Sequence, residues 1–271
     1  MAATLEGKLT QLRTILAELP SALVAFSGGV DSTFLLRVAH DVLGERCTAL
    51  TTVSPTTPAD DLAGARSLAV AMGATHVIVD TNELAIPGYA ANPTNRCWFC
   101  KDNLFTICVA EAERRGIGAV IDGANLDDLG DHRPGLKAAA ERSIRHPLVE
   151  AGLTKADIRA ASRNLGLPTW DRPASPCLSS RFPYGTHITE DRLARVAAAE
   201  QVLRARGFRE LRVRFHDQVA RLEVPVHEMP RLLEPGVREE IVRELRALGF
   251  SYVALDLQGF RSGSLNETLG S

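Results

Sequence analysis

The 271-residue chain lacks most features that would direct a protein to a membrane, a secretory route or a nucleic acid. No apolar run is long enough to span a bilayer, and the first residues lack the basic and apolar regions of a signal peptide. The five cysteines are an odd number, which argues against a disulfide framework and favours a reducing compartment. A net charge of −2 gives no field that attracts nucleic acid or anionic lipid. We therefore expect a cytoplasmic protein without a membrane or nucleic-acid partner.

Lysine is also scarce, since only four of the 31 basic residues are Lys. The others are arginines, whose planar guanidinium binds phosphate through two hydrogen bonds. The rest of the composition is ordinary for a globular protein, with 45% hydrophobic and 24% charged residues. A chain of this length forms one large domain or two modest ones.

Apolar strands alternate with helices over the first two thirds of the chain. Strands are predicted at 22–27, 47–53, 75–80 and 118–122, and helices at 5–18, 32–43, 58–72, 100–115, 135–142 and 154–165. This alternation predicts an α/β fold with a doubly wound, mainly parallel sheet, whose strand ends form one functional edge. Residues 168–188 are rich in Pro and Ser and are predicted to form a long functional loop.

The last third of the chain has a different pattern. A predicted helix at 189–206 precedes two alternating runs at 211–215 and 219–224, which predict a β-hairpin. A helix at 236–248 and a strand at 251–257 follow. We therefore expect two domains, an α/β domain at 1–187 and a smaller α+β domain at 188–271.

The most informative motif is SGGVDS at residues 27–32, between a predicted strand and a predicted helix. Two glycines let the backbone approach an anion, and N–H groups at the helix N-terminus then point at it. No Lys follows these glycines, so the motif is not a Walker A loop. Asp31 would repel a phosphate unless Mg²⁺ lies between them. The motif therefore predicts that Mg-ATP is bound by its phosphates.

Two further motifs contain cysteines. The C-x-x-C of residues 95–101 (NRCWFCK) could be half of a metal site, a redox pair or two buried thiols. No second C-x-x-C exists, so a zinc finger is not expected. Cys177 lies in the predicted loop, within residues 172–181 (RPASPCLSSR). Cys47 and Cys108 lie in apolar runs and are expected in the core.

Together with residues 256–266 (DLQGFRSGSLN), these motifs resemble one family over nearly the whole chain, the ATP-dependent sulfur transferase family LarE. SGGVDS alone marks the wider ATP pyrophosphatase, or PP-loop, superfamily. The resemblance implies a PP-loop fold and a role in building the nickel-pincer nucleotide cofactor of lactate racemase. It implies that ATP adenylates a carboxylate of pyridinium-3,5-dicarboxylate mononucleotide, releasing pyrophosphate, and that sulfur then replaces the activated oxygen.

The resemblance also implies the source of the sulfur. Cys177 matches the cysteine that handles sulfur, and in some members this residue gives up its own sulfur and becomes dehydroalanine. In other members three cysteines hold a [4Fe–4S] cluster, for which Cys97, Cys100 and Cys177 are the candidates here. We favour the cluster, with sacrificial Cys177 as the alternative.

Binding roles are expected for residues of both domains. Ser27, Gly28, Gly29, Val30, Asp31 and Ser32 of the turn, together with Asn125 and Asp127 of the acidic segment 125–134, are expected to bind Mg-ATP. Arg212 and Arg214 are expected to bind the phosphate of the nucleotide substrate, because positions two apart on a strand share a face, and Ser180 and Arg181 are expected at the same phosphate. The resemblance implies Glu200 and Glu223 as metal ligands. His216 and His227 have no partner at ligand spacing and are expected at the surface.

Three other functions remain open from the sequence. They are a tRNA thiolase of the PP-loop type, an amide-forming synthase and a non-catalytic nucleotide-binding regulator. The slightly acidic chain lacks the basic face of a tRNA-binding enzyme, and no amidotransferase module is visible. We expect a homo-oligomer with a small-molecule partner.

Overall fold

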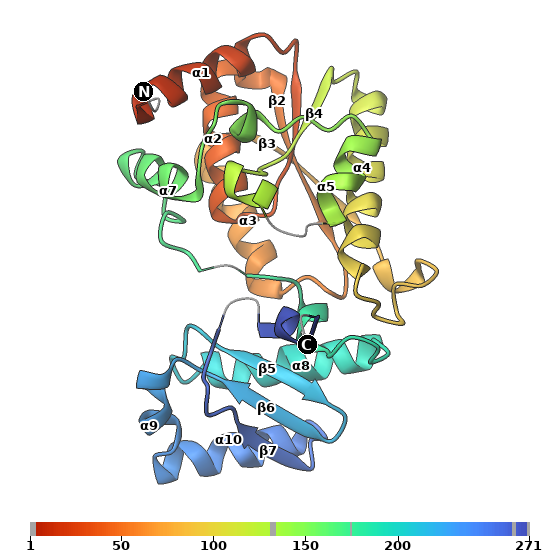
Figure 1. Ribbon diagram of the computed structural model, residues 1–271, viewed down its shortest axis with the longest axis vertical. Helices are drawn as coiled ribbons and strands as arrows, with labels where there is room; N and C mark the ends of the chain where they lie inside the picture. Colours follow the sequence, from red (N-terminus) through yellow and green to blue (C-terminus); the bar gives the residue numbers. More distant parts are fainter. Residues whose placement is uncertain (1–3, 131–133, 174, 262–263, 270–271) are drawn as a thin grey trace. The chain divides into compact units, whose positions relative to one another are not determined.

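The computed structural model describes residues 4–130, 134–173, 175–261 and 264–269 (Figure 1). Contacts divide the chain into two compact units. The first unit comprises residues 1–54, 59–83 and 95–175, and the second comprises 55–58, 84–94 and 176–271. The domain boundary expected at 187/188 stays a prediction, although residues 176–187 have most of their contacts within the second unit.

A four-stranded parallel sheet forms the centre of the first unit, in the order β3-β2-β1-β4. Its strands are β1 (Ala22–Ala25), β2 (Cys47–Val53), β3 (Thr75–Asp80) and β4 (Ala119–Ile121). All the pairings are parallel, so the carboxyl ends of the strands share one edge. The predicted parallel α/β fold is thereby confirmed.

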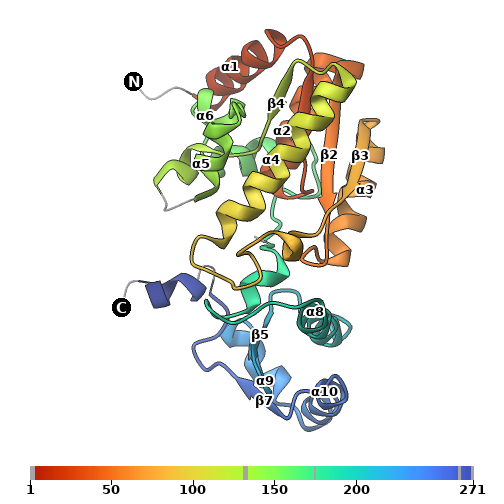
Figure 2. The same cartoon turned by 90° about the vertical axis from the view of Figure 1, so that its right-hand side faces the viewer.

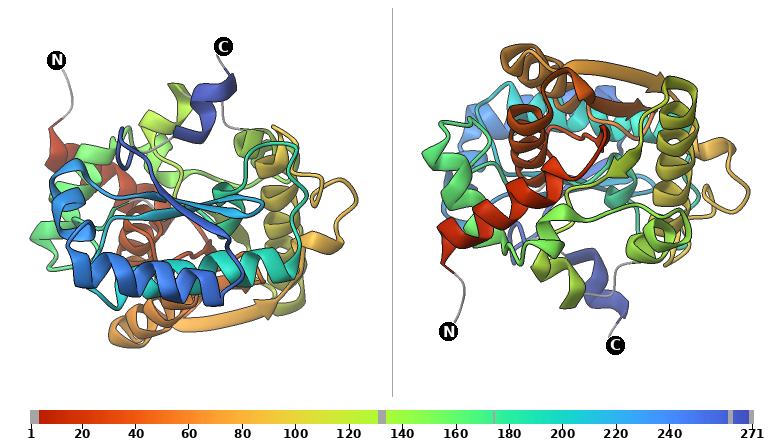
Figure 3. Two further views of the ribbon diagram at one scale, coloured as in Figure 1. Left: turned by 90° about the horizontal axis from the view of Figure 1, so that it is seen from below. Right: turned by 90° about the horizontal axis from the view of Figure 1, so that it is seen from above.

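Helices cover both faces of this sheet (Figures 2 and 3). They are α1 (Leu5–Ala17), α2 (Val30–Leu43), α3 (Ala59–Met72), α4 (Arg96–Arg115), α5 (Pro134–Glu141), α6 (Pro147–Glu150) and α7 (Lys155–Asn164). Ala22 and Val24 of β1 join the core cluster that contains α1, α2 and α7, whereas Leu23 and Ala25 join the cluster that contains α4 and α5. Successive side chains of a strand point to opposite faces, which explains why β1 is apolar at every position.

Helix α4 begins at Arg96, four residues before the predicted start. Its first turn therefore contains the C-x-x-C motif. The prediction began later because this turn has no periodic apolar pattern, and the first buried apolar side chain of the helix is Phe105.

The second unit contains a three-stranded sheet in the order β5-β6-β7. Strands β5 (Arg212–His216) and β6 (Val219–Glu223) form the predicted antiparallel hairpin, and β7 (Tyr252–Leu255) pairs parallel to β6. Its helices are α8 (Glu190–Arg204), α9 (Met229–Leu232) and α10 (Pro235–Ala247). Side chains of α8 and α10 share a core with Val213, Phe215 and Leu222 of the hairpin.

Short 3₁₀ helices connect these elements. They are η1 (Gly44–Arg46), η2 (Glu83–Ala85), η3 (Leu126–Gly130), η4 (Leu178–Arg181), η5 (Val226–Glu228) and η6 (Ser264–Leu269). The predicted loop at 168–188 thus contains one helical turn, η4. Within the described ranges, no helix is long and apolar enough to cross a bilayer.

Two early segments of the chain belong to the second unit. The Leu178 N–H donates to the Thr56 carbonyl at 2.9 Å, and the hydroxyls of Tyr89 and Ser179 lie 2.9 Å apart. The Asn92 side-chain amide donates to the Pro183 carbonyl at 2.7 Å. These bonds fix the loop that carries Cys177 and η4 to residues about 90 to 120 positions earlier in the sequence.

Candidate functional site

The SGGVDS turn connects β1 to α2 at the carboxyl edge of the parallel sheet. Gly28 has a φ of +71°, and a Cβ at this position would lie 3.1 Å from the backbone of Ala65. The hydroxyls of Ser27 and Ser32 lie 3.1 Å apart, and the Ser27 Oγ accepts from the Gly29 N–H at 3.3 Å. No side chain caps the N-terminus of α2. Its first N–H groups are therefore available to an anion, and binding of Mg-ATP by this turn stays a prediction.

Asp31 lies in the first turn of α2, and its two carboxylate oxygens differ. The Oδ2 accepts from the Lys155 Nζ at 2.5 Å, whereas the Oδ1 is buried and has no hydrogen-bond partner among the residues that the structure describes. Burial raises the pKa of Asp31 more than the Lys155 ammonium lowers it. A buried carboxylate oxygen without a partner is unfavourable, and a bound cation would stabilise it. The donor set therefore fits Mg²⁺ at this oxygen.

Lys155, which the sequence analysis did not assign, connects Asp31 to the acidic segment. It is the first residue of α7, and its backbone N–H donates to the Asp127 Oδ2 at 2.8 Å. The buried Asn125 accepts from the Asp127 N–H through its Oδ1 at 3.0 Å. These bonds connect Asn125 and Asp127 to the turn through Lys155, and their role in binding ATP stays a prediction. Asp131, also in this segment, lies outside the described residues.

Arg172 is a second residue that sequence reasoning left without a role. Its guanidinium donates to the Gly28 carbonyl at 3.1 Å and to the Asp61 Oδ1 at 2.6 Å. This contact joins the turn to the start of α3 and to the Pro/Ser loop. Two signals could have identified these residues: Lys155 is one of only four lysines, and Arg172 opens the RPASPCLSSR motif.

The cysteines divide into a buried and an accessible set. Cys47 and Cys108 are fully buried, and burial raises the pKa of each thiol to about 12, which confirms their predicted place in the core. Cys97 is exposed and Cys100 partly exposed, on the first turn of α4. Positions three apart on a helix share a face. The third candidate, Cys177, is partly exposed and belongs to the second unit. Among the residues that the structure describes, no group of three or more His, Cys, Asp or Glu side chains is arranged to hold a metal.

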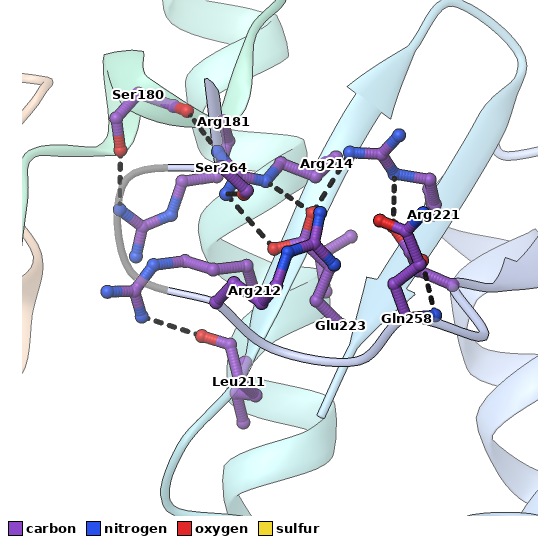
Figure 4. A network of polar contacts seen from close by, with 12 residues as sticks. Ser180, Arg181, Leu211, Arg212, Arg214, Arg221, Glu223, Gln258 and Ser264 are labelled. Carbon is purple, nitrogen blue, oxygen red and sulfur yellow. Dashed lines mark hydrogen bonds and ion pairs between the residues drawn. The ribbon is translucent and has the colours of Figure 1, made fainter. Parts of the chain in front are cut away.

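Two buried arginine–glutamate pairs lie in the second unit, and Figure 4 shows the one that joins Arg214 to Glu223. Arg181 and Glu200 are both fully buried, and the guanidinium donates to the two carboxylate oxygens at 2.7 and 3.0 Å. The same guanidinium donates to the carbonyl of Cys177 at 3.1 Å. Arg204 adds a bond to Glu200 at 2.8 Å. Burial opposes ionisation of Glu200, but the bond and charge of Arg181 hold its pKa below the ordinary value.

A second pair, Arg214 with Glu223, links the strands of the hairpin. The Arg214 guanidinium donates to both Glu223 oxygens at 2.9 and 3.0 Å, to the Ser180 carbonyl at 2.6 Å and to the Ser264 hydroxyl at 2.8 Å. Arg221 also donates to Glu223, at 2.9 Å. Arg214 thereby fixes η4 and η6 against the sheet (Figure 4).

Arg212 lies on the same face of β5 as Arg214. It donates to the Leu211 carbonyl at 2.7 Å, and its guanidinium carbon lies 4.9 Å from the centre of the Phe260 ring. Burial lowers the pKa of Arg212 to about 10, and the nearby Arg181 charge acts in the same direction. A guanidinium destabilised in this way favours a bound anion.

A pocket of about 520 Å³ lies within the second unit. Its wall combines apolar side chains with polar and charged ones, which include Arg181, Arg214, His216, Arg221, Asp256, Gln258 and Arg261. His216, expected at the surface, is half-buried here, and no described residue forms a hydrogen bond with its buried Nε2. Two-residue periodicity places it on the face of Arg214, a consequence that the prediction missed. His227 is exposed as expected.

The structure thus places all four residues of the predicted phosphate site in the second unit, namely Ser180, Arg181, Arg212 and Arg214. The predicted metal ligands Glu200 and Glu223 lie in the same network, but arginines occupy the oxygens of both carboxylates. Their role as metal ligands stays a prediction. In the predicted C-terminal motif, residues 262 and 263 lie outside the described residues.

A glycine turn at the carboxyl edge of a parallel sheet, with a carboxylate in the helical turn that follows, defines an α/β protein of the PP-loop class. No protein-family model matches the chain. The tRNA-specific 2-thiouridylase MnmA of Azorhizobium caulinodans is 30% identical over 191 residues, which are 56% of this chain and 48% of the relative.

Two other relatives match along nearly their whole length. An uncharacterized protein of Synechocystis sp. is 48% identical over 265 residues, or 98% of this chain and 99% of the relative. The pyridinium-3,5-bisthiocarboxylic acid mononucleotide synthase of Lactiplantibacillus plantarum is 42% identical over 269 residues, or 98% of this chain and 96% of the relative. The chain belongs to the family of this synthase, the LarE family of sulfur-transferring enzymes.

Proposed function

We propose that this enzyme uses ATP to adenylate a carboxylate of pyridinium-3,5-dicarboxylate mononucleotide, releases pyrophosphate, and converts the acyl-adenylate into a thiocarboxylate. Two rounds would give the bisthiocarboxylic product for which the Lactiplantibacillus relative is named. That product would serve as a precursor of the nickel-pincer cofactor of lactate racemase.

The observation that carries the proposal is the unpartnered Oδ1 of Asp31 inside the SGGVDS turn. ATP reaches proteins as its Mg²⁺ complex, and a carboxylate beside the phosphates needs that ion between them. Asp31 would hold Mg²⁺, which would neutralise charge on the phosphates. Lys155, 2.5 Å from the other oxygen, would then be close enough to contact a phosphate itself.

The two-step chemistry explains why ATP is needed. A carboxylate is a poor electrophile, but an acyl-adenylate has AMP as a good leaving group, which a thiolate displaces. In the second unit, Arg212 and Ser180 would bind the phosphate of the mononucleotide. Arg181 and Arg214 would act mainly by holding that site in shape, because glutamates and backbone carbonyls already occupy their guanidinium groups.

Pyrophosphate release tests this function directly. Incubation with Mg-ATP and pyridinium-3,5-dicarboxylate mononucleotide should release pyrophosphate and AMP, and each ligand alone should release neither. Release that does not depend on the dicarboxylate would contradict the assignment. ATP binding without any pyrophosphate would favour the non-catalytic regulator.

We further propose that the sulfur passes through a [4Fe–4S] cluster held by Cys97, Cys100 and Cys177. The accessible positions of Cys97 and Cys100 on one helical turn support two of the three ligands. Anaerobic reconstitution should give about four irons per chain, and Cys97→Ala should lose that iron while pyrophosphate release continues.

Sacrificial Cys177 predicts a different outcome. Intact-protein mass spectrometry would then show a loss of roughly 34 Da after one turnover, as β-elimination converts Cys177 into dehydroalanine. Cys97→Ala and Cys100→Ala would stay active. That combination would refute the cluster and leave adenylation standing.

A tRNA thiolase is the second candidate, since the MnmA relative is a tRNA-specific 2-thiouridylase. The match to that relative covers only about half of each chain, which favours the first candidate. Thiolated uridine in tRNA, detected by mass spectrometry after incubation with ATP, would reverse this preference. We also propose that the enzyme is cytoplasmic and forms a homo-oligomer. Light scattering would measure the number of subunits.

A further inference from the structure

Asp122 and His146 form a close pair that has no part in the site described above. The Oδ1 of Asp122 lies 2.5 Å from the Nδ1 of His146 and also accepts from the Ala124 N–H at 3.1 Å. Asp122 is 7% exposed, and the His146 side chain is 21% exposed. Among the described residues, none hydrogen-bonds the other ring nitrogen, Nε2. A carboxylate at Nδ1 fixes the ring and leaves Nε2 free to exchange a proton.

The pair lies at the carboxyl edge of the parallel sheet. Asp122 directly follows β4, and its N–H donates to the carbonyl of Arg145, which forms a parallel bridge with Ile121. His146 therefore begins beside the end of β4, and β4 is the neighbour of β1, which leads into the SGGVDS turn. The segment that contains Arg145 and the strand β1 lie on either side of β4, so they are separated by two strand spacings, or about 10 Å.

The segment after Asp122 also touches the turn itself. A Cβ on Gly123 would lie 2.9 Å from the backbone nitrogen of Ser32. Only a glycine lets this strand end approach the first turn of α2 so closely. Asp122 therefore directly precedes Gly123, the residue that packs against the proposed ATP turn.

The pair lies on the α4 side of the sheet. Val120 belongs to the core cluster shared with α4 and α5, and strand alternation places Asp122 on that same face. Lys101 of α4 is near enough to oppose protonation of His146, and it follows the C-x-x-C by a single position. The imidazole thus lies on the same face and at the same edge as the N-terminal turns of α4.

Charges around the ring favour a basic imidazole. The hydrogen bond of Asp122 raises the pKa of His146 above its ordinary value, and the charges of Asp122 and of Glu150 on α6 act in the same direction. Burial and Lys101 oppose this effect. Glu150 is itself bound by Arg145, at 2.5 Å.

We propose that His146, held by Asp122, is the general base of the sulfur-transfer step. This inference rests on the proposed function. Nε2 takes the proton of a hydrosulfide, the sulfur forms a bond to the acyl carbon, and the bond from that carbon to AMP breaks, which leaves the thiocarboxylate. The electron pair leaves on the phosphate oxygen of AMP, and the imidazolium then releases its proton to water. Asp122 is a positioning residue, since it acts through His146.

Two variants, His146→Gln and Asp122→Asn, separate this role from adenylation. Pyrophosphate release, and trapping of the acyl-adenylate by hydroxylamine, should stay within about twofold of the wild type in His146→Gln. Single-turnover formation of thiocarboxylate with sodium sulfide present should fall at least about 100-fold, the lower end of the usual contribution of a general base. His227→Gln, at an exposed histidine, is the control and should change neither rate.

The pH profile supplies a readout that a structural role would not change. In the wild type, the sulfur-transfer rate should rise with pH as the imidazolium loses its proton. In Asp122→Asn this rise should shift to lower pH, because the carboxylate that raises the pKa is gone, and in His146→Gln it should disappear.

Two outcomes would overturn the inference. One is His146→Gln with wild-type sulfur transfer and an unchanged pH profile. The other is equal loss of adenylation and sulfur transfer, with a lowered unfolding temperature, which would make the pair a structural link between β4 and α6. If the wild type itself formed no acyl-adenylate, the proposed function would fail first and this inference with it.

Discussion

The two units treat their buried charges in opposite ways. In the first unit, Asp31 has one oxygen paired with Lys155 and one buried oxygen without a partner. In the second unit, Glu200 accepts from Arg181 and Arg204, and Glu223 accepts from Arg214 and Arg221. The Asp31 carboxylate needs a bound cation to satisfy its second oxygen, whereas arginines already satisfy the oxygens of Glu200 and Glu223 without a ligand.

This difference distinguishes carboxylates that are available for ligand binding from carboxylates that stabilise the fold. An unsatisfied carboxylate contributes little to folding and gains from a cation, so its removal should affect catalysis more than stability. A saturated buried pair leaves an uncompensated charge when one partner is lost, so its removal should affect stability first. Each prediction below tests one side of this contrast.

The largest effect is expected in the second unit. Glu200→Gln removes the carboxylate that neutralises the fully buried Arg181, and we expect the free energy of unfolding to fall by about 3–5 kcal/mol. Urea denaturation followed by circular dichroism measures it. Glu239→Gln, at an exposed position on α10, should change stability by less than about 0.5 kcal/mol.

The same pair gives this variant a pH signature. The native pKa of Glu200 is lowered, so its stabilisation is present above the ordinary pKa of a glutamate and is lost as pH falls below that value. The stability difference between wild type and Glu200→Gln should therefore shrink only in acid. An equal difference at all pH values would contradict the ion-pair explanation.

In the first unit, Asp31→Asn should abolish pyrophosphate release and spare the fold. We expect at least a 100-fold loss of rate, because the amide no longer offers a charged oxygen to Mg²⁺. Stability should change by less than about 1 kcal/mol, since one oxygen has no described partner and the Lys155 ammonium that binds the other is partly exposed. Wild-type release by the variant would show that Asp31 has no role in ATP use.

A smaller effect should distinguish two arginines of one strand. Arg212→Ala should weaken binding of the mononucleotide about tenfold and leave ATP binding unchanged, as measured by calorimetry. Arg214→Ala should in addition lower stability, because it breaks four hydrogen bonds to Glu223, Ser180 and Ser264. If both variants lost equal stability, Arg212 would also have a role in stabilising the fold.

The smallest expected effect concerns thiol reactivity. Iodoacetamide at pH 8 should modify Cys97, Cys100 and Cys177 in the cluster-free native protein, because these three side chains are at least partly exposed. Cys47 and Cys108 should react only after unfolding, since both are buried with a pKa of about 12. Peptide mapping by mass spectrometry distinguishes the two sets.

Much of the fold follows from local patterns in the sequence. The strands predicted at 47–53 and 75–80 match β2 and β3 residue for residue, because each apolar run is bounded by turn residues. The parallel arrangement followed from alternation with helices. The order of the strands did not, since periodicity carries no information about which neighbours pair.

The candidate site was predictable only where a motif is local. SGGVDS identified the turn from six adjacent residues, but the Lys155–Asp31 contact joins residues 124 positions apart. Pairing of Glu200 with Arg181 was equally hidden, because a charged residue at one position of an amphipathic helix is usually exposed. Such contacts depend on how elements pack, and a single sequence does not encode that directly.

The division of the chain affects how the protein is synthesised. The chain passes between the two units at residues 54/55, 58/59, 83/84, 94/95 and 175/176. Tyr89 and Asn92 leave the ribosome early, yet their partners Ser179 and Phe182 lie 90 residues later. At a synthesis rate of about 5–20 residues per second, Ser179 and Phe182 are made roughly 5–18 seconds after Tyr89 and Asn92. The loop that holds Cys177 therefore reaches its folded form only late in translation.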